Sequence, residues 1–467
     1  MFACVNATVT VVGLGATGLS LARYLGKRGA DVTVVDGAAD PAGLPTLRAQ
    51  LPGVAFQPCD LTRDTLPASD IVALSPGVPR SLPALKQAIA HGRCVVGDIE
   101  IFAQDVSPQA RAVAVTGSNG KTTTTALAGQ LVQSTLPAAR VAGNIGVPIL
   151  DALDEAPDCP AWVLELSSFQ LESTESLRVE RAAVLNVTDN HLDRYPSFFA
   201  YAASKERLFA HAAAQVLNRD DVWSMSMRRP ALPCATFGAS MPTQGSDFGL
   251  AAARHGRDGS VSLMRGDEVL LPVSQLGVRG QHNALNALAA LAITADFAVP
   301  LEQQRTVLRR FAGMPHRCQY VGSVDGVAVI DDSKATTVIA TSAALAGLAQ
   351  PTWLIAGGDG KGQAFAELAA AAAPFCRAVH LIGRDAPVIA AALESQGVPY
   401  RRYSSLEDAV HAALDAAKSG EQLLLSPACA SWDMFRNFGH RADVFLSAVE
   451  SWARAHGRTL VSAGGSA

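Results

Sequence analysis

The chain has 467 residues, of which 49% are hydrophobic and 17% charged, and its formal net charge is −4. This length exceeds one ordinary hydrophobic core, so we expect about three domains. The balanced charge, without basic or aromatic-rich patches, argues against nucleic acid or an anionic membrane as a partner. We expect no signal peptide and no membrane-spanning segment, because the first residues lack a basic stretch with a long apolar run and no apolar run reaches spanning length. The eight cysteines lack paired spacing, so we expect a cytoplasmic protein with reduced thiols.

The first segment, residues 1–107, opens with a strand, a glycine turn, a helix and a second strand. The turn is GLGATG over residues 13–18, and the second strand ends in Asp36. This pattern is typical of dinucleotide sites, where an acid at this position contacts a ribose. A bound nucleotide diphosphate is favoured over a purely structural turn. An NAD-dependent oxidoreductase is the alternative, but a second phosphate loop further along the chain argues against it.

The run IVALSPGVP over residues 71–79 is another strand that ends in a Pro/Gly turn, which contains Ser75, Pro76 and Gly77. Such turns lie at the carboxyl edge of an α/β sheet, where ligands bind. We take Ser107-Pro108 as the linker that ends the domain.

The central segment, residues 108–312, contains the turn GSNGKT over residues 117–122, between an apolar strand and a helix. Its glycines let backbone N–H groups face phosphates, and the helix N-terminus adds positive potential. Lys121 would neutralise the outer phosphates of ATP, and the Thr122 hydroxyl would reach Mg²⁺. The spacing between the glycines is shorter than in the usual phosphate loop.

Three further residues of the central segment bear on this site. Glu165 interrupts an apolar strand, so it needs a cation; Mg²⁺ is favoured over a buried ion pair with arginine. His191 follows the next strand and is either a metal ligand or an ordinary hydrogen-bonded histidine. Lys205, on an amphipathic helix, is one surface lysine among many.

The rest of the central segment is less regular. Residues 219–272 indicate a β-rich excursion, and a helix is expected over residues 284–295. Asn283 stands at the start of that helix. A helix cap is the safer interpretation of it, and recognition of a base is the alternative.

The last segment, residues 313–467, repeats one arrangement, in which apolar strands end in polar or glycine-rich turns with helices between them. This predicts an open parallel α/β sheet. Lys334 and Lys361 follow two of the strands and suggest an anionic substrate. The alternative, that these turns are only helix starts, remains open.

Taken together, these stretches resemble the Mur ligases, the ATP-dependent amide-forming ligases of peptidoglycan precursor synthesis. The resemblance is carried by the short phosphate loop over residues 116–122, by LELSSFQL over 164–171, and by NVT with HLDR over 186–194. It implies three α/β domains: a Rossmann-like domain (1–107) that binds a UDP substrate, a central P-loop ATPase-like mixed sheet (108–312), and a C-terminal Rossmann-like open parallel sheet (313–467).

Within the family, DSKAT over residues 332–336 and SPACAS over 426–431 are similar to the branch that adds D-glutamate. That similarity implies UDP-N-acetylmuramoyl-L-alanine, D-glutamate and ATP as substrates, an acyl-phosphate intermediate, and a monomeric enzyme whose third domain closes over the site. Another family member, a folate polyglutamate ligase and a nonenzymatic ATP-binding switch are the alternatives. The chain departs from the common pattern at Gly37-Ala38, Asn190, Thr337 and Trp432.

The resemblance also implies residue roles. Catalytic roles fall on Lys121, Lys205, His191 and Arg317. Two Mg²⁺ ions would be held by Thr122, Glu165, His191 and a carbamylated Lys205. ATP contacts fall on Gly117, Ser118, Asn119, Gly120, Lys121, Thr122, Thr123, Asn144, Asn283, Arg317, Asp332 and Lys334. Substrate contacts fall on Thr17, Asp36, Ser75, Pro76, Gly77, Asn144, Ser167, His191, Lys334, Thr336, Lys361, Ser431 and Phe438.

Overall fold

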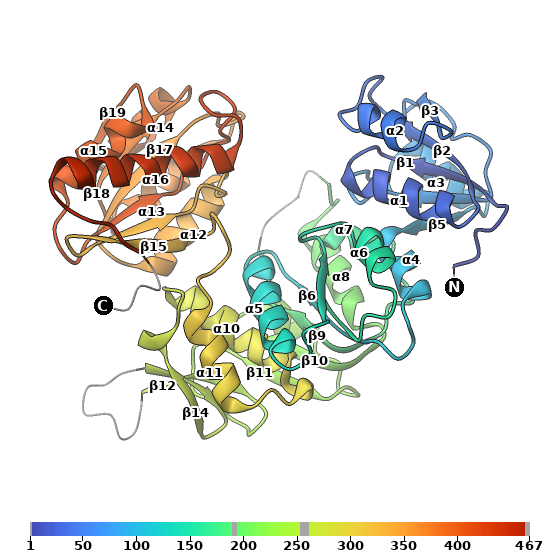
Figure 1. Cartoon of the computed structure of the whole chain (residues 1–467), viewed down its shortest axis with the longest axis horizontal. Coiled ribbons are helices and arrows are strands. Elements are labelled where there is room, and N and C mark those ends of the chain that lie inside the picture. The colour runs from blue at the N-terminus through green and yellow to red at the C-terminus, as the bar shows by residue number, and fades with distance from the viewer. Residues whose placement is uncertain (1, 189–193, 253–260, 463–467) are drawn as a thin grey trace. The chain divides into compact units, whose positions relative to one another are not determined.

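The computed structural model describes residues 2–188, 194–252 and 261–462. The chain divides into two compact units, residues 1–272 with 285–307, and residues 273–284 with 308–467. The first unit contains two sheets and the second contains one (Figure 1). The predicted three-domain α/β fold is confirmed, with one sheet in each domain. The predicted boundaries near residues 107 and 312 stay predictions.

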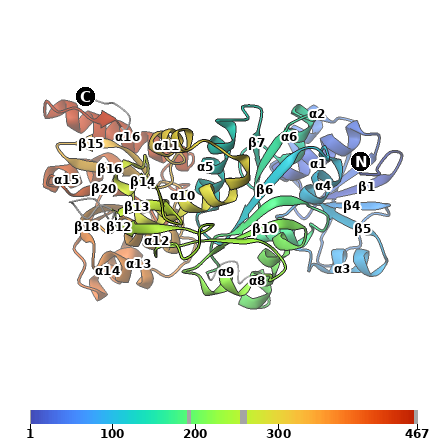
Figure 2. The ribbon, with the colours of Figure 1, turned by 90° about the horizontal axis from the view of Figure 1, so that it is seen from below.

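The first sheet has five parallel strands in the order β3-β2-β1-β4-β5. Alternate strand residues point to opposite faces. Val11 and Val34 share a core with α1, whereas Val12 and Val35 share a core with α3, so the two helices cover opposite faces (Figure 2). The elements are β1 (Thr8–Val12), α1 (Ala16–Lys27), β2 (Asp31–Asp36), α2 (Leu44–Gln50), β3 (Ala55–Pro58), β4 (Ile71–Leu74), α3 (Pro83–Ala90), β5 (Cys94–Gly97) and α4 (Asp98–Asp105).

The central sheet has nine strands in the order β14-β13-β12-β11-β10-β9-β6-β8-β7. It is mixed, as predicted, because β12, β13 and β14 form antiparallel pairs while the other pairs are parallel. The strands are β6 (Arg111–Thr116), β7 (Arg140–Gly143), β8 (Ala161–Glu165), β9 (Val179–Val184), β10 (Ala212–Asn218), β11 (Cys234–Phe237), β12 (Phe248–Ala252), β13 (Val261–Arg265) and β14 (Glu268–Pro272). The α-helices are α5 (Lys121–Gln133), α6 (Ile149–Glu155), α7 (Ser168–Glu172), α8 (Phe198–Glu206), α9 (Val222–Ser226), α10 (Gln281–Ile293) and α11 (Leu301–Arg310).

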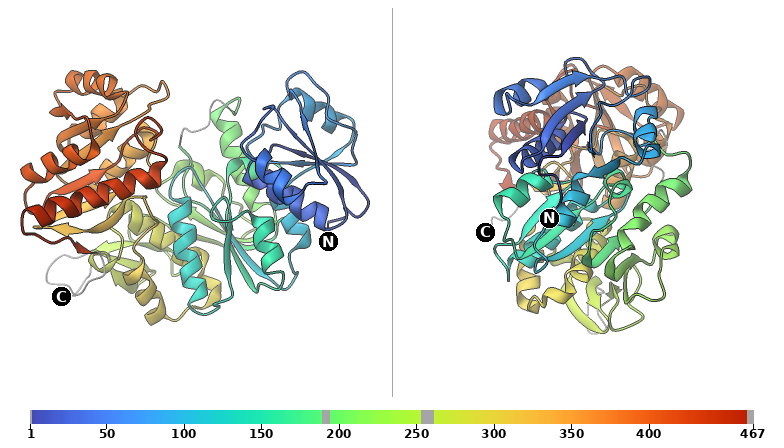
Figure 3. Two further views of the ribbon diagram at one scale, coloured as in Figure 1. Left: turned by 45° about the horizontal axis from the view of Figure 1, so that its top comes forward. Right: turned by 90° about the vertical axis from the view of Figure 1, so that its right-hand side faces the viewer.

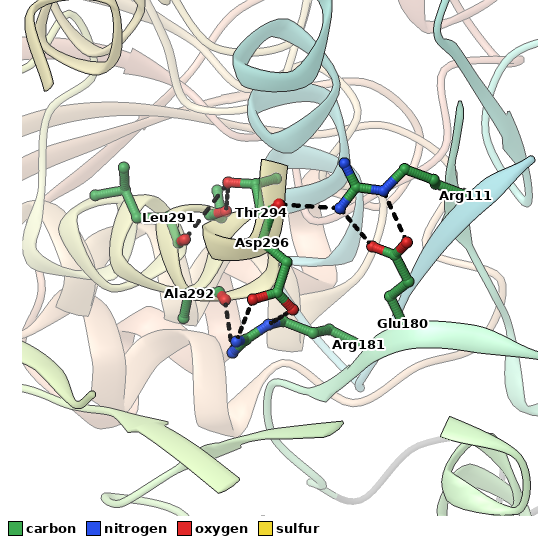
Figure 4. A network of polar contacts seen from close by, with 8 residues as sticks. Arg111, Glu180, Arg181, Leu291, Ala292, Thr294 and Asp296 are labelled. Carbon is green, nitrogen blue, oxygen red and sulfur yellow. Dashed lines mark hydrogen bonds and ion pairs between the residues drawn. The ribbon is translucent and has the colours of Figure 1, made fainter. Parts of the chain in front are cut away.

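Two arginines fix the end of α10 against the central sheet (Figure 4). Arg111 of β6 binds both carboxylate oxygens of Glu180 on β9 at 2.7 Å and also donates to the Asp296 carbonyl at 3.0 Å. Arg181 binds both carboxylate oxygens of Asp296 at 2.6 and 2.8 Å. Bidentate pairs of this kind hold both partners in one geometry. They therefore hold the residues that follow α10 against the first residues of β6 and β9. The phosphate loop lies at the other end of β6.

The third sheet has seven strands in the order β19-β18-β17-β20-β16-β15-β21. Helices α12 to α14 pack on one face and α15 and α16 on the other, which gives the layered unit seen in Figure 3. The elements are β15 (Gln319–Val324), β16 (Val327–Asp331), α12 (Val338–Leu348), β17 (Thr352–Gly357), α13 (Ala366–Ala372), β18 (Cys376–Ile382), α14 (Ala386–Ser395), β19 (Tyr400–Arg402), α15 (Leu406–Ala416), β20 (Gln422–Leu425), α16 (Phe438–Ala455) and β21 (Val461–Ser462).

This third sheet is mixed, not purely parallel as the sequence suggested. Strands β15 and β16 form an antiparallel hairpin, and β21 adds antiparallel to β15. The hairpin turn is Asp325-Gly326, and both residues have positive φ, 51° and 79°. Two positive φ angles suit the twist of a tight hairpin, and Asp-Gly is a strong sequence signal for it. The strands β16 to β20, which carry the predicted site turns, are parallel to one another.

The eight cysteines are all free. Within the described ranges, the helices are all too short or too polar to cross a membrane.

Candidate active site

The glycines of the first turn have three different surroundings. Gly13 has a φ of +94°, and a Cβ there would lie 2.7 Å from the Val78 side chain. A Cβ on Gly18 would lie 1.8 Å from the Gly13 carbonyl, whereas a Cβ on Gly15 would meet nothing within 4 Å. These are the roles expected of a dinucleotide turn: a tight bend, close helix packing, and open space where a pyrophosphate approaches the backbone.

Asp36, the predicted ribose partner, uses both carboxylate oxygens on backbone amides. Oδ2 accepts from the Leu14 N–H at 2.7 Å, and Oδ1 accepts from the Ala38 N–H at 2.9 Å. It therefore also holds the glycine turn in shape, a role that sequence reasoning did not foresee. Thr17 lies in the first turn of α1, half-buried at the same carboxyl edge of the sheet.

The second predicted substrate turn, Ser75 to Gly77, follows β4. Strands β1 and β4 are neighbours at the point where the strand order reverses, which is where ligands bind in open α/β sheets. Ser75 is buried, and Pro76 and Gly77 are more exposed. Arg194 donates to the carbonyls of Gly77 and Val78 at 3.1 and 3.2 Å and thereby ties this turn to the central domain.

The phosphate loop lies between β6 and α5, as predicted. Gly120 caps α5 with a φ of +80°, and a Cβ there would lie 2.4 Å from Oδ1 of Asn286. Neighbouring residues brace the loop: the Asn119 N–H donates to Asn186 Oδ1 at 2.8 Å, and the Thr188 N–H donates to Ser118 Oγ at 3.0 Å. Thr122 and Thr123 follow in the first turn of α5, partly exposed. The loop thus holds its shape through side chains from a second strand end.

Two lysine amines converge on one carbonyl oxygen of this loop. Lys121 Nζ donates to the Gly117 carbonyl at 2.9 Å, and Lys205 Nζ donates to the same oxygen at 2.8 Å. Lys205 is only 1% exposed, so the prediction that it is an ordinary surface lysine was wrong. Its helix turns it inward against the Tyr201 ring. Burial, and then the charge of Lys121, lower the pKa of Lys205 well below its usual value.

Glu165 is a buried carboxylate on the strand next to the phosphate loop. β8 pairs in parallel with β6, and Glu165 stands opposite Val115. Its Oε1 accepts from Asn144 Nδ2 at 2.9 Å. Its Oε2 is buried without a hydrogen-bond partner among the described residues, and the predicted alternative, an ion pair with arginine, is not found among them. An orphaned carboxylate oxygen beside a phosphate loop fits a Mg²⁺ ion, which prefers oxygen ligands.

The predicted metal set is only partly within the described structure. His191 lies outside the described residues, and its role stays a prediction. Over residues 2–188, 194–252 and 261–462, no three histidine, cysteine, aspartate or glutamate side chains form a metal-binding group. The other members of the predicted set, Thr122, Glu165 and Lys205, lie within the described residues.

Ser167, a predicted substrate contact, is the N-cap of α7. Its hydroxyl accepts from the Gln170 N–H at 3.2 Å, and the Gln170 side chain accepts from the Ser167 N–H at 3.1 Å. This reciprocal capping box fixes the residue two positions after Glu165.

The predicted residues of the third sheet lie at the carboxyl edge formed by β16, β20 and β17, which are neighbours. Lys334 follows β16, and its amine lies 5.2 Å from the centre of the Phe438 ring. Lys361 follows β17 with a φ of +52°, and Ser431 is buried after β20. Thr336 is half-buried just before α12. The structure therefore brings Lys334 and Phe438 together within this unit.

Asp332, Arg317 and Asn283 are predicted ATP contacts that lie in the second unit. Asp332 accepts from the Cys318 N–H at 3.0 Å and from Ser426 Oγ at 2.7 Å, and burial raises its pKa to about 7. Arg317 lies near enough to oppose that rise. Asn283 is not a helix cap, because α10 begins at Gln281, and the Asn283 side chain donates to the Arg279 carbonyl at 2.8 Å.

Sequence reasoning assigned no role to Arg441 or Asn286. Arg441 is fully buried and donates to the carbonyls of Ser333 and Cys429 at 2.7 and 3.1 Å, which ties two site turns to α16. Burial lowers its pKa to about 10. Asn286 contacts Thr124 of α5 at 3.4 Å. For Asn286 the available signal was an amide inside the mainly apolar helix α10, whereas Arg441 stands among other charged residues of α16.

Fold and site together define a phosphate-loop α/β protein with a second, nucleotide-type glycine turn. Three family models match in chain order: the Mur ligase MurD-like N-terminal domain over residues 7–97, the Mur ligase middle domain over 115–294, and the Mur ligase glutamate ligase domain over 316–429.

Curated relatives extend the match over nearly the whole chain. A UDP-N-acetylmuramoylalanine–D-glutamate ligase of Methylobacillus flagellatus is 48% identical over 94% of this chain and 96% of its own. The protein of the same name from Thiobacillus denitrificans is 47% identical over 95% and 96%. The chain belongs to the Mur ligase family.

The solved structure of a UDP-N-acetylmuramate-alanine ligase from Thermotoga maritima shares the fold. It has a TM-score of 0.59 and 19% identity over 95% of this chain and 99% of that one.

Proposed function

We propose that the chain is an ATP-dependent ligase that joins D-glutamate to UDP-N-acetylmuramoyl-L-alanine. One observation carries the proposal: relatives named for this activity are 46–48% identical over at least 94% of the chain. Residues 1–107 would bind the UDP part, residues 108–312 ATP, and residues 313–467 D-glutamate. The enzyme is a cytoplasmic monomer in this proposal.

The reaction needs an activated acid, because a carboxylate and an amine do not condense unaided in water. The alanine carboxylate attacks the γ-phosphorus of ATP, the bond to the β-phosphate oxygen breaks, and ADP leaves. The amine of D-glutamate then attacks the acyl carbon of the resulting acyl phosphate. The nitrogen loses a proton, the carbon–oxygen bond to phosphate breaks, and an amide remains.

The chain's contribution is positioning and charge neutralisation. Lys121 neutralises the ATP phosphates from the loop, and the backbone N–H groups of α5 face them. Thr122, Glu165 and His191 would hold Mg²⁺, which when bound offsets negative charge on the phosphates. Arg317 is proposed to act on the same phosphates from the second unit.

We further propose that Lys205 carries a carbamate. The amine is buried beside the Lys121 charge, and Gly117 is its only hydrogen-bond acceptor among the described residues. An unprotonated amine adds to CO₂ with formation of a nitrogen–carbon bond and loss of one proton. The product is an anion, which suits a place near Mg²⁺ better than an ammonium does.

The acid-binding end of the site is proposed to lie in the second unit. Lys334, Lys361 and the Ser431 hydroxyl are suited to the two carboxylates of glutamate. Thr336 and Phe438 complete this set. On the UDP side, Thr17, Asp36 and Ser75 to Gly77 are proposed to contact the nucleotide, with Asn144 and Ser167 nearer the reacting end.

The function is tested by phosphate release with UDP-N-acetylmuramoyl-L-alanine, ATP and Mg²⁺, with one amino acid at a time. We expect release with D-glutamate and not with L-glutamate, L-alanine, L-lysine or diaminopimelate. Preference for any other amino acid would overturn the assignment, and ATP binding without turnover would favour a nonenzymatic switch.

The carbamate is tested by ¹³C nuclear magnetic resonance after incubation with ¹³C-bicarbonate. We expect a carbamate signal in the wild type that is missing in Lys205→Arg. A spectrum identical in the two proteins would contradict the modification.

A further inference from the structure

Helix α4, the last helix of the first domain, presents two buried carboxylates to residues 167–176 of the central domain. This segment contains α7. Asp98 is 3% exposed, and its Oδ2 accepts from Gln170 Nε2 at 3.1 Å. Glu100 accepts from the backbone N–H groups of Glu175 and Ser176 at 2.7 and 2.9 Å, and from the Ser176 hydroxyl at 2.6 Å. The two carboxylates therefore hold the segment near its beginning and at its end.

Gln170 connects Asp98 to the Ser167 side chain. A glutamine amide has a donor end and an acceptor end, so a fixed acceptor for its NH₂ group fixes the direction of its oxygen. Asp98 supplies that acceptor, and Gln170 Oε1 then accepts from the Ser167 N–H at 3.1 Å and from Ser167 Oγ at 3.2 Å. Ser167 follows the buried Glu165 by two residues, so its backbone position constrains the end of β8.

The segment is otherwise fastened by arginines. Arg207 donates to the carbonyls of Leu171 and Thr174 at 2.7 and 3.0 Å, and Arg80 donates to the Glu172 carbonyl at 2.7 Å. These bonds hold the backbone of its later part, residues 171–174. None of these bonds reaches Ser167. At the beginning of α7, the Arg194 guanidinium carbon lies 3.9 Å from the centre of the Phe169 ring, while the Gln170 side chain is bound by Asp98.

Stability alone is a poor reason for a carboxylate at position 98. Its Oδ1 is buried without a hydrogen-bond partner among the described residues. Burying a half-satisfied carboxylate costs free energy, and an apolar side chain of similar size would avoid that cost. The contact at Gly97 is already tight, since a Cβ there would lie 2.2 Å from Ser173 Oγ. The carboxylate is therefore better explained by what it orients.

We propose that Asp98, acting through Gln170, is a positioning residue of the ligase site. It sets the Ser167 hydroxyl and the end of the strand that carries Glu165, while Glu100 holds the far end of the same segment. Since α4 belongs to the first domain, these contacts also join the glycine-turn sheet to the phosphate-loop sheet. The inference rests on the proposed function of the site.

The test compares Asp98→Ala and Asp98→Asn with a matched control, Asp105→Ala. Asp105 is on the same helix, its side chain is 4% exposed, and it accepts from the Tyr24 hydroxyl at 2.8 Å within the first domain. Three quantities are measured: kcat and KM for each substrate, Mn²⁺ affinity by electron paramagnetic resonance, and hydrogen exchange of residues 165–176.

We expect Asp98→Ala to lower kcat about 10- to 100-fold and to weaken Mn²⁺ binding about tenfold, the usual cost of losing a partner that orients a metal ligand. The KM for D-glutamate should stay unchanged, and exchange should accelerate at the beginning of α7. Asp98→Asn keeps an acceptor oxygen and should restore most of the rate. Asp105→Ala should lower the melting temperature without changing kcat or Mn²⁺ affinity.

A double-mutant cycle with Gln170→Leu separates positioning from general damage. If Asp98 acts through Gln170, the double variant should be no worse than about twofold below Gln170→Leu alone. Additive losses would overturn the proposal, as would an Asp98→Ala protein whose kcat and Mn²⁺ affinity match those of Asp105→Ala. A wild type without ligase activity would refute the proposed function, while Mn²⁺ affinity and hydrogen exchange would still decide the positioning role.

Discussion

The two strand–glycine–helix turns of the first unit share a backbone design and differ in the charges beside them. At residues 13–18 the neighbour is an acid, Asp36, which accepts from the Leu14 N–H at 2.7 Å. At residues 117–122 the neighbours are two amines, Lys121 and Lys205, which donate to one carbonyl oxygen at 2.9 and 2.8 Å. Both turns follow a buried parallel strand at the carboxyl edge of a sheet.

This difference indicates that the glycine backbone supplies the cradle and the side chains select the ligand. Backbone N–H groups and a helix N-terminus suit any phosphate. A carboxylate disfavours further negative charge and suits a ribose hydroxyl, whereas the Lys121 ammonium suits the more highly charged triphosphate.

The largest effect is expected from Lys121→Ala. Removing the only side-chain cation of the loop itself should lower ATP-dependent phosphate release by about 10³-fold or more, because charge on the transferring phosphoryl group is left unneutralised. Lys27→Ala is the control, since that side chain is 66% exposed in a surface pair with Asp154. The control should keep full activity. A Lys121→Ala rate within tenfold of the wild type would contradict the assignment of the loop.

A contrast between two glycines tests the other turn. In Gly18→Ala the new Cβ would lie 1.8 Å from the Gly13 carbonyl, so we expect about 3 kcal/mol or more of destabilisation, measured by thermal unfolding. In Gly15→Ala the Cβ enters open space. That variant should fold normally and raise the KM of the UDP substrate at least about tenfold, with the KM of ATP unchanged. An altered KM for ATP would show that the two turns are not separate sites.

The joint between the two sheets gives a pH prediction. Burial raises the pKa of Asp98 from 3.8 to about 6, so the folded protein binds this proton more tightly than the unfolded chain does. Wild-type stability relative to Asp98→Asn should therefore fall as pH rises from about 4 to about 6 and then stay level. Between these limits, the free energy of unfolding of the wild type relative to Asp98→Asn should fall by about 3 kcal/mol. Melting temperatures of the two proteins across this range measure it, and parallel curves would contradict the buried, ionisable state of Asp98.

Much of the fold followed from local patterns. The strand–glycine–helix runs at residues 8–18 and 112–132 predicted both sites, since their periodicity and turn residues agree. The hairpin at Asp325-Gly326 was missed although its dipeptide signals it. Tertiary burial was not readable: Lys205 lies on an amphipathic helix, and nothing in its neighbours shows that its amine turns inward.

Contacts between distant segments were also beyond the sequence. Asn283 was expected to cap a helix, but α10 begins two residues earlier, at Gln281, and the Asn283 amide binds the Arg279 carbonyl instead. Asp98 and Arg441 gain their meaning from partners 72 and 108 residues away. A single sequence gives no measure of such separations, so these roles needed the structure.

The central claim is that the phosphate loop brings ATP to a carboxylate held by the first domain. The most direct measurement uses UDP-N-acetylmuramoyl-L-alanine with both carboxylate oxygens labelled with ¹⁸O, together with ATP, D-glutamate and Mg²⁺. The account predicts one ¹⁸O atom in each phosphate released and one in the amide carbonyl. Phosphate free of ¹⁸O, formed at the same rate as the amide, would contradict it.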